Sequence, residues 1–243
     1  MYSVEVKNLT KKYKNKTAVD SISFTVKSRE LFALLGVNGA GKTTTIRMLS
    51  CLSAPTDGFA AVNGHNCIKN SDDVKKEISI SPQETSVAEN LTVRENLRFI
   101  AEVYGFSKEK IKLRTDKMIN LFNMHDIADS RAKTLSGGWK RKLSIAMALI
   151  SEPKVLFLDE PTLGLDVLAR RELWTAIESL KGKITIILTT HYMEEAEKLS
   201  DTIAVMVGGK IAAMGTLAEL EKISGQTGLE NAFVAIAERS ADK

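Results

Sequence analysis

Residues 31–43 read LFALLGVNGAGKT, and this stretch decides the fold. Leu31–Leu35 is a continuous apolar run, which is typical of a strand buried on both faces. Gly36–Thr43 fits the pattern GxxxxGK[ST], in which a strand precedes the loop and a helix follows it. Glycines let such a loop turn so that its backbone N–H groups point inward at a polyphosphate, and the helix adds its positive dipole end. The stretch predicts a nucleotide-binding site at the end of a buried strand.

Two side chains of this loop have specific expected contacts. Lys42 supplies a point charge for the β- and γ-phosphates, and the Thr43 hydroxyl is a ligand for Mg²⁺. Together with the backbone of the loop, we expect the nucleotide to be bound by Gly36, Asn38, Gly39, Ala40, Gly41, Lys42, Thr43 and Thr44.

A second apolar run, Val155–Leu158, ends in two acidic residues, Asp159 and Glu160. A parallel strand delivers its C-terminal residues to the edge of the sheet where ligands bind. Because side chains alternate along a strand, the two carboxylates point to opposite sides and have different tasks. We expect Asp159 to hold Mg²⁺, directly or through water, and Glu160 to orient and polarise the attacking water.

The remaining periodicities predict an α/β fold with three parts. Val4–Val6 and Ile22–Val26 alternate, which indicates an N-terminal antiparallel β subdomain. Strand-like runs that alternate with helical patterns from residue 155 onward indicate a parallel sheet covered on both faces, the core of a phosphate-loop (P-loop) NTPase. Residues 84–150 are densely charged and helical in pattern, so we expect an inserted α-helical subdomain there.

Composition excludes several classes of protein. The chain has 243 residues, 44% of them hydrophobic and 26% charged, which is ordinary for a globular protein. Its 34 basic and 30 acidic residues give a net charge of +4, too small to indicate a nucleic-acid partner. The longest apolar run, Ile145–Ile150, is far shorter than the roughly 20 residues that cross a bilayer, and the first residues lack a secretory signal pattern. Cys51 and Cys67 have neither metal-ligand nor CxxC spacing, which predicts reduced thiols.

The segment Leu135–Trp139, LSGGW, stands at the expected start of a helix. Ser136 is a favourable N-cap, so a capped helix with a flexible turn is one interpretation. A serine followed by Gly137 and Gly138 at a helix N-terminus also forms an anion site, and we call Ser136–Gly138 the SGG segment. Two copies that face head to tail can then clamp one nucleotide between the phosphate loop of one copy and the SGG segment of the other.

Together, and in this order, the motifs resemble those of the nucleotide-binding subunit of an ATP-binding cassette (ABC) transporter. The resemblance covers residues 1–225 and leaves 226–243 as a C-terminal tail. It implies an ATPase whose cofactors are ATP and Mg²⁺. Tyr13 resembles the aromatic residue that stacks on adenine, and Asp166 resembles the acidic residue of a loop that contacts a second subunit.

Two further residues take their expected roles from this resemblance. Gln83, in the tripeptide SPQ, resembles the loop glutamine that senses the γ-phosphate or Mg²⁺ and relays to a membrane partner. His191, after the expected strand Ile184–Leu188, resembles the switch histidine that contacts the γ-phosphate and positions Glu160. We therefore expect the catalytic residues to be Glu160, His191 and Gln83. The expected Mg²⁺ ligands are Thr43, Gln83 and Asp159.

The chain departs from the family pattern in two places. The fifth residue of the signature is usually glutamine and here is Trp139, which we expect to alter packing at the dimer interface while activity persists. Residues 163–166 read LGLD instead of the commoner serine-alanine form. The LGLD form is similar to ATP-binding subunits of the drug- and antibiotic-resistance exporter branch (ABC-2 type), whose membrane partner is a separate polypeptide.

The resemblance also implies partners and a location. It implies a dimer that closes around two ATP molecules, formed with a second copy of the chain or with a paralogous cassette. The implied membrane partner is a separately encoded integral-membrane permease, one short helix of which enters a groove near residues 84–102. The implied location is peripheral, at the cytoplasmic face of the cell membrane, with no nucleic-acid partner.

Other functions stay open on the sequence. An ABC-type ATPase without a membrane partner acts on ribosomes or DNA, but such chains typically carry two cassettes or long coiled-coil or zinc insertions. A P-loop kinase or GTPase is disfavoured by the SGG segment, the strand-end acids, His191 and the lack of an Asn-Lys-x-Asp segment. An importer cassette resembles this chain, although the LGLD form and the short tail favour export.

Overall fold

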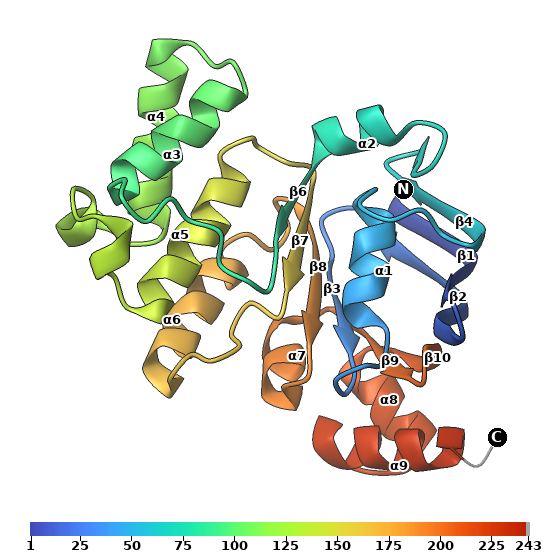
Figure 1. The fold of residues 1–243 in the computed structure, drawn as a ribbon. Coiled ribbons are helices and arrows are strands. Elements are labelled where there is room, and N and C mark those ends of the chain that lie inside the picture. Colours follow the sequence, from blue (N-terminus) through green and yellow to red (C-terminus); the bar gives the residue numbers. More distant parts are fainter. Residues whose placement is uncertain (242–243) are drawn as a thin grey trace.

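The computed structural model describes residues 1–241 and contains two β-sheets with helices packed between and around them (Figure 1). An antiparallel sheet has the strand order β2-β1-β4-β5, and a larger sheet has the order β10-β9-β3-β8-β7-β6. The antiparallel sheet consists of β1 (Tyr2–Tyr13), β2 (Lys16–Lys27), β4 (Asp57–Val62) and β5 (His65–Asn66). The larger sheet consists of β3 (Leu31–Leu35), β6 (Ile78–Ser81), β7 (Val155–Asp159), β8 (Thr185–Thr190), β9 (Thr202–Val207) and β10 (Lys210–Gly215).

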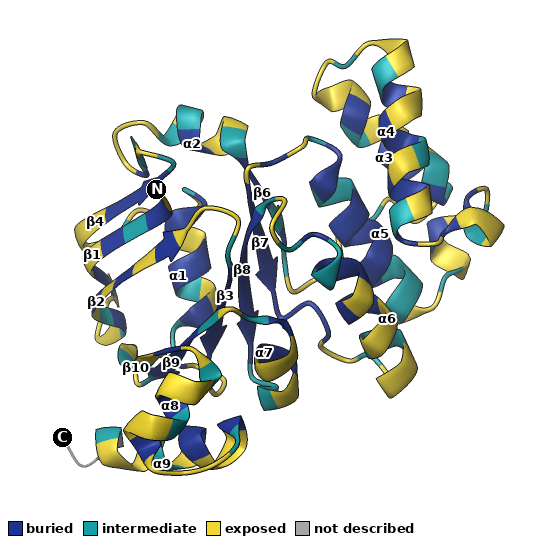
Figure 2. Cartoon of the chain, turned by 180° about the vertical axis from the view of Figure 1, so that it is seen from behind, coloured by how far each residue is buried: buried dark blue, intermediate teal, exposed yellow. Residues whose placement is uncertain are grey.

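The centre of the larger sheet is buried on both faces. Strands β3, β8 and β7 are parallel neighbours, and every residue in them is buried (Figure 2). Parallel neighbours end at the same edge of a sheet, so the phosphate loop after β3, the acids at the end of β7 and the segment after β8 lie side by side. The predicted parallel core is confirmed, and it is what assembles the site.

Helix α1 (Lys42–Leu49) lies between the two sheets (Figure 1). Its buried Ile46 and Leu49 share one apolar cluster with Phe24 of β2 and Phe32 of β3. The two phenylalanine rings stack with their centroids 5.1 Å apart. Burial of each such side chain contributes about 1.5–3 kcal/mol, so the helix that follows the phosphate loop is firmly fixed on the core.

Three helices form a separate lobe on the side of the larger sheet away from the antiparallel sheet (Figure 1). They are α3 (Val93–Val103), α4 (Lys108–Leu121) and α5 (Gly137–Leu149), joined through two 3₁₀ turns, His125–Ile127 and Ala132–Thr134. A capping box between Thr92 and Glu95 starts α3, and the Ser107 hydroxyl caps α4. All three helices fall within 84–150, as expected for the inserted helical subdomain.

The other helices are α2 (Ser71–Glu77), α6 (Val167–Glu178), α7 (Met193–Leu199), α8 (Leu217–Ser224) and α9 (Leu229–Ala241). Helix α9 follows the expected end of the cassette at 225, and its Phe233 and Ile236 are buried in one cluster with Val205 of β9. The last described residues therefore pack on the edge of the larger sheet. Within residues 1–241, no helix is both long and apolar enough to cross a membrane.

The structure contains strands that the sequence patterns did not predict. Strand β10 is antiparallel to β9, so the larger sheet is mixed at this edge and not wholly parallel. Gly208 and Gly209, both with positive φ, make the turn between these strands. A Gly-Gly pair after an apolar run is a hairpin signal, but β10 itself lacks clear alternation. Strands β4 and β5 and helix α2 are likewise short and weakly patterned.

Candidate nucleotide-binding and hydrolysis site

The phosphate loop runs from the end of β3 into α1, and its glycines are required by close packing. A Cβ atom on Gly36 would lie 2.4 Å from the carbonyl oxygen of Met206. A Cβ on Gly41 would lie 2.5 Å from the carbonyl oxygen of Ala18, and Gly41 has a φ of +105°. The Gly36 N–H donates to the Thr190 carbonyl oxygen at the end of β8. The loop is thereby held against both neighbouring strands.

Lys42 is buried, with 5% of its surface exposed, and points back into the loop. Its Nζ donates to the carbonyl oxygens of Gly36 at 2.7 Å and Val37 at 3.2 Å. It also lies 3.0 Å from Oε1 of Glu160, which is 6% exposed. A buried cation among carbonyls and a carboxylate is placed where phosphate oxygens can replace those partners.

Asp159, the last residue of β7, faces the phosphate loop. Its Oδ1 accepts a hydrogen bond from the Thr43 hydroxyl at 3.1 Å and from the Thr189 hydroxyl at 2.5 Å. A hydroxyl and a carboxylate so close are hard oxygen donors of the kind that Mg²⁺ takes, together with substrate phosphates and water. Within residues 1–241, no group of three or more His, Cys, Asp or Glu side chains could hold a metal ion. Thr43 and Asp159 therefore fit a Mg²⁺ ion whose other ligands are mainly the phosphates of a nucleotide and water.

The side chains of Glu160 and His191 form a hydrogen bond. Nδ1 of His191 lies 2.6 Å from Oε2 of Glu160, so the carboxylate contacts Lys42 through one oxygen and His191 through the other. Glu160 has a φ of +48°, a conformation that is strained for a residue with a side chain. Its N–H donates to the carbonyl and the hydroxyl of Thr189, and these bonds hold the strained turn. The two acids therefore contact different side chains, Asp159 the hydroxyls of Thr43 and Thr189 and Glu160 the side chains of Lys42 and His191.

Lys42, Thr43, Glu160 and His191 line a cavity of about 280 Å³, to which Gln83, from the loop after β6, and Leu163 also contribute. Asp159 is not in the lining and is linked to it through its hydrogen bond from Thr43. Every residue that the sequence predicted for the loop is either in the lining or, like Gly36 and Ala40, in the backbone that supports it. The lining is Asn38, Gly39, Gly41, Lys42, Thr43, Thr44, Gln83, Glu160, Leu163 and His191.

Some predicted site residues lie outside this cavity. Tyr13 is 45% exposed at the end of β1, beneath Lys11, whose Nζ is 5.0 Å from the ring centroid. The SGG segment lies at the start of α5, where Ser136 is the N-cap but makes no capping bond through its side chain. Asp166 caps α6 by accepting from the Ala169 N–H at 2.9 Å. None of these residues is in the lining of the nucleotide cavity.

Arg141 of α5 is a site residue that the sequence reasoning missed. Its guanidinium donates to four backbone carbonyl oxygens: Pro161 at 2.8 Å, Asp159 at 2.8 Å, Gln83 at 3.2 Å, and Pro82. Burial lowers the pKa of Arg141 to about 10, so the side chain stays charged at neutral pH. Sequence offered no signal for it, because a basic residue in a helix normally faces solvent.

Behind the site, Glu195 of α7 is buried and forms no ion pair with any residue of 1–241. Its Oε1 accepts from the Trp174 indole N–H at 3.1 Å, and its other oxygen has no hydrogen-bond partner among the described residues. Burial raises the pKa of this carboxyl above its usual range. The group lies close enough to Glu160 for the charge of Glu160 to raise it further.

A phosphate loop that follows a central parallel strand, with a histidine after the neighbouring strand β8 and two acids at the end of the next strand, β7, defines a P-loop nucleotide hydrolase. The comparison with known families makes this more specific, since the family model described as ABC transporter matches residues 19–163. The chain belongs to the ABC transporter family, whose ATP-binding domains hydrolyse ATP. The resemblance inferred from the motifs is confirmed.

Known relatives place the chain near drug-resistance and lipid-transport proteins. It is 40% identical to the daunorubicin/doxorubicin resistance ATP-binding protein DrrA of Streptomyces peucetius, over 92% of this chain and 68% of DrrA. It is 39% identical to the human phospholipid-transporting ATPase ABCA3, over 88% of this chain and only 13% of ABCA3. A solved ATP binding subunit of an ABC transporter is 31% identical and superposes with a TM-score of 0.85, covering 96% of this chain and 98% of that one.

Proposed function

We propose that this chain hydrolyses ATP to drive export through a separate integral-membrane permease, as one half of a head-to-tail dimer. The observation that carries the proposal is the carboxylate of Glu160, held between Lys42 at 3.0 Å and His191 at 2.6 Å. A carboxylate so placed can take a proton from a water molecule beside the γ-phosphate. The similarity to DrrA, a drug-resistance ATP-binding protein, supports export.

In the proposed reaction, a water oxygen attacks the γ-phosphorus of ATP while its proton passes to Glu160. The bond from the γ-phosphorus to the bridging oxygen breaks, which leaves ADP and phosphate. Phosphoryl transfer depends mainly on positioning and charge stabilisation, so no covalent protein intermediate is needed. His191 fixes the orientation of the Glu160 carboxylate through their 2.6 Å contact.

The nucleotide is held by groups of the phosphate loop. Lys42 exchanges the carbonyls of Gly36 and Val37 for phosphate oxygens, and the loop N–H groups point at the same oxygens. When bound, Mg²⁺ supplies positive charge that offsets the phosphates. The residues that would hold it are Thr43, Asp159 and Gln83.

A dimer would complete the site. The SGG segment lies outside the cavity of its own chain, and a facing copy, or a paralogous cassette, would bring an SGG segment to the phosphate loop. Apolar side chains around Asp166 are unusually exposed and support an interface there: Leu163 is 41%, Val167 62% and Leu168 73% exposed. Closure would bury the γ-phosphate and exclude bulk water.

A second cavity offers a place for the permease. It measures about 460 Å³ and lies between β6 and the helical lobe, next to the loop of Gln83. Its lining is mainly apolar and includes Ile80, Ile100, Val103 and Met147, with Val103 67% exposed. A short helix from the permease with one apolar face would fit this cavity. Closure of the dimer around ATP would then move that helix.

The direct test is affinity purification of the tagged chain from gently solubilised native membranes, followed by mass spectrometry. We expect an integral-membrane protein with several apolar spans to co-purify, which places the chain at the cytoplasmic face of the membrane. A single cysteine at Val103 should then crosslink to that protein. Recovery of the chain with no membrane protein, together with ATPase activity stimulated by nucleic acid, would replace the transport function by that of a free ATPase.

A further inference from the structure

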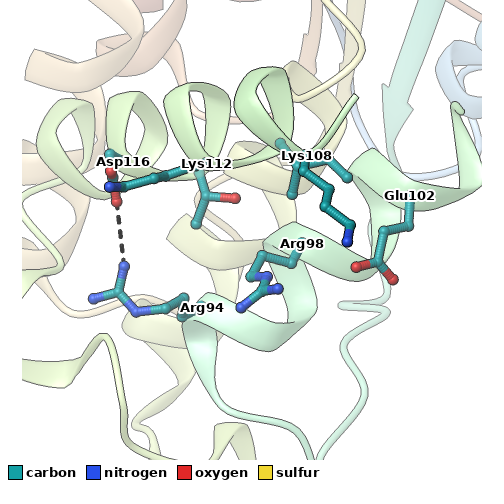
Figure 3. Close-up of a pocket in the computed structure, with 8 residues that line it drawn as sticks. Arg94, Arg98, Glu102, Lys108, Lys112 and Asp116 are labelled. Carbon is teal, nitrogen blue, oxygen red and sulfur yellow. Dashed lines mark hydrogen bonds and ion pairs between the residues drawn. The ribbon is translucent and has the colours of Figure 1, made fainter. Parts of the chain in front are cut away.

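A third cavity, of about 510 Å³, lies in the helical lobe between α3 and α4 (Figure 3). It shares no lining residue with the nucleotide cavity or with the apolar cavity proposed for the permease. Six charged side chains surround it, four basic and two acidic: Arg94, Arg98, Lys108, Lys112, Glu102 and Asp116. Its volume lies within the range of small-molecule sites.

Three of the four cations are free of ion pairs. Arg94 contacts Asp116 at 3.3 Å and, on its other side, Asp129 at 3.1 Å. The side chains of Arg98, Lys108 and Lys112 form no ion pair and donate no hydrogen bond within residues 1–241. Figure 3 shows Lys112 and Lys108 extending along the cavity toward Asp116 and Glu102 without a bond to either. With Asp129 included, the four cations face three acids, so the cavity carries a net positive charge.

Thr115 supplies a second and independent observation. It lines the same cavity and is 2% exposed, and its hydroxyl oxygen has no hydrogen-bond partner in the described part of the chain. A threonine inside a helix normally bonds the carbonyl four residues earlier. A buried polar atom without a partner calls for an explanation, and a bound group that accepts the hydroxyl proton is one.

We propose that this cavity binds a phosphomonoester, whose phosphate pairs with the cations that form no ion pair and accepts a hydrogen bond from the Thr115 hydroxyl. Arg98 offers the planar donor fork that suits phosphate, and Lys108 and Lys112 add point charges from the facing helix. The phosphate belongs either to a soluble metabolite or to a lipid headgroup. This site shares no lining residue with the nucleotide cavity. A negative result in the phosphomonoester test would therefore leave the proposed ATPase function unaffected.

The test uses the full-length chain saturated with ADP, so that the phosphate loop is already filled. Glycerol 3-phosphate is titrated while backbone amide signals are followed by NMR. We expect saturable shifts confined to residues around the α3–α4 cavity. Shifts spread over every basic surface, or shifts that never saturate, would overturn the proposal for a soluble ligand unless vesicles then show specific binding.

Vesicles distinguish the lipid source. We expect a lipid ligand to give binding to phosphatidylcholine vesicles that contain phosphatidic acid, a phosphomonoester, and not to vesicles of equal charge that contain phosphatidylserine, a phosphodiester. Equal binding to both would show a general attraction to negative surfaces. That result, together with no saturable shift from glycerol 3-phosphate, would overturn the proposal.

Two variants locate the site. Arg98→Gln combined with Lys112→Gln should weaken binding by about tenfold for each lost contact. The matched control is Lys117→Gln combined with Lys222→Gln, which removes the same charge from residues outside the cavity. Thr115→Val keeps the shape and removes the unpartnered hydroxyl, so it should weaken binding while the melting temperature holds or rises. Equal losses in the variant and control pairs would contradict the assignment.

Discussion

Nη2 of Arg141 donates a 2.8 Å hydrogen bond to the backbone carbonyl oxygen of Asp159, which joins helix α5 to the end of strand β7. The same guanidinium donates to the carbonyl oxygens of Pro161, Pro82 and Gln83. One buried cation therefore ties together the helix of the SGG segment, the glutamine loop and the strand end that carries the acids. In the proposed dimer, this contact would connect the SGG segment, which would serve a facing copy, with the acids that would serve the chain's own nucleotide.

Replacement of Arg141 should destabilise the protein. Arg141→Met removes the donor from four carbonyl oxygens, two of them in buried hydrogen bonds, and we expect the free energy of unfolding to fall by about 3 kcal/mol. Arg141→Lys keeps the charge but reaches fewer carbonyls, so its loss should be smaller. Urea denaturation followed by circular dichroism measures both. Arg171→Met, on the exposed face of α6, is the control and should change stability by no more than about 0.5 kcal/mol; equal effects at both positions would disprove the role of Arg141.

Glu160→Gln should separate ATP binding from hydrolysis. The amide cannot accept the proton of the attacking water, so turnover should fall by about 10² to 10⁴-fold while ATP affinity is kept. Phosphate release and equilibrium ATP binding are the two measurements. Glu197→Gln removes an exposed carboxylate from α7 and should leave turnover unchanged. Near-normal turnover in Glu160→Gln would mean that another group is the general base.

Ser136→Arg tests the head-to-tail dimer. Ser136 makes no side-chain capping bond in its own chain, so a larger side chain there should leave folding intact. In the proposed dimer, the new arginine would meet the phosphates of the ATP bound to the facing copy. Its added size and charge should abolish turnover. Mixing the variant with a second variant, Lys42→Ala, should restore part of the activity, because the mixed dimer has one intact site. Full activity of Ser136→Arg by itself would contradict the shared site.

The sequence predicted the parts of the site that depend on local pattern and on parallel-strand topology. Lys42, Asp159 and His191 are far apart in the chain, yet the rule that parallel strands end at one edge was enough to bring them together. Tyr13 and the SGG segment were predicted by resemblance, and neither lines the nucleotide cavity of the single chain. The SGG segment was expected to serve a facing chain, which is a property of an assembly and not of the pattern of one strand or helix.

Arg141 and Glu195 could not have been predicted in the same way. Arg141 acts on backbone carbonyls, which every residue has, so no partner residue marks the contact in the sequence. Glu195 follows Glu194 in a short helix with an ordinary charged pattern, and its burial depends on how α7 packs against Trp174. Strand β10 was not predicted for a related reason. Its pairing with β9 stabilises a segment whose own sequence pattern is weak.

Glu195 should make stability depend on pH. Burial raises its folded pKa, so the folded state holds this proton to higher pH than the unfolded state does. Its contribution is therefore most favourable below the unfolded pKa and is lost as pH rises through the folded pKa. Glu195→Gln keeps the acceptor for Trp174 and does not ionise, so its melting temperature should exceed that of the natural chain more at pH 8 than at pH 5. A constant difference across this range would rule out the titration.

Gly41→Ala tests whether close packing or backbone conformation requires the glycine. Its new Cβ would lie 2.5 Å from the Ala18 carbonyl oxygen, whereas Gly182 has a φ of +72° with open space around it. We expect Gly182→Ala to cost about 1 kcal/mol for the left-handed conformation alone, and Gly41→Ala to cost about 3 kcal/mol because the loop must also shift. If Gly41→Ala does not fold, Gly39→Ala in the same loop, which meets no atom within 4 Å, should still fold. Equal losses at positions 41 and 182 in urea denaturation would show that packing against Ala18 is not the constraint.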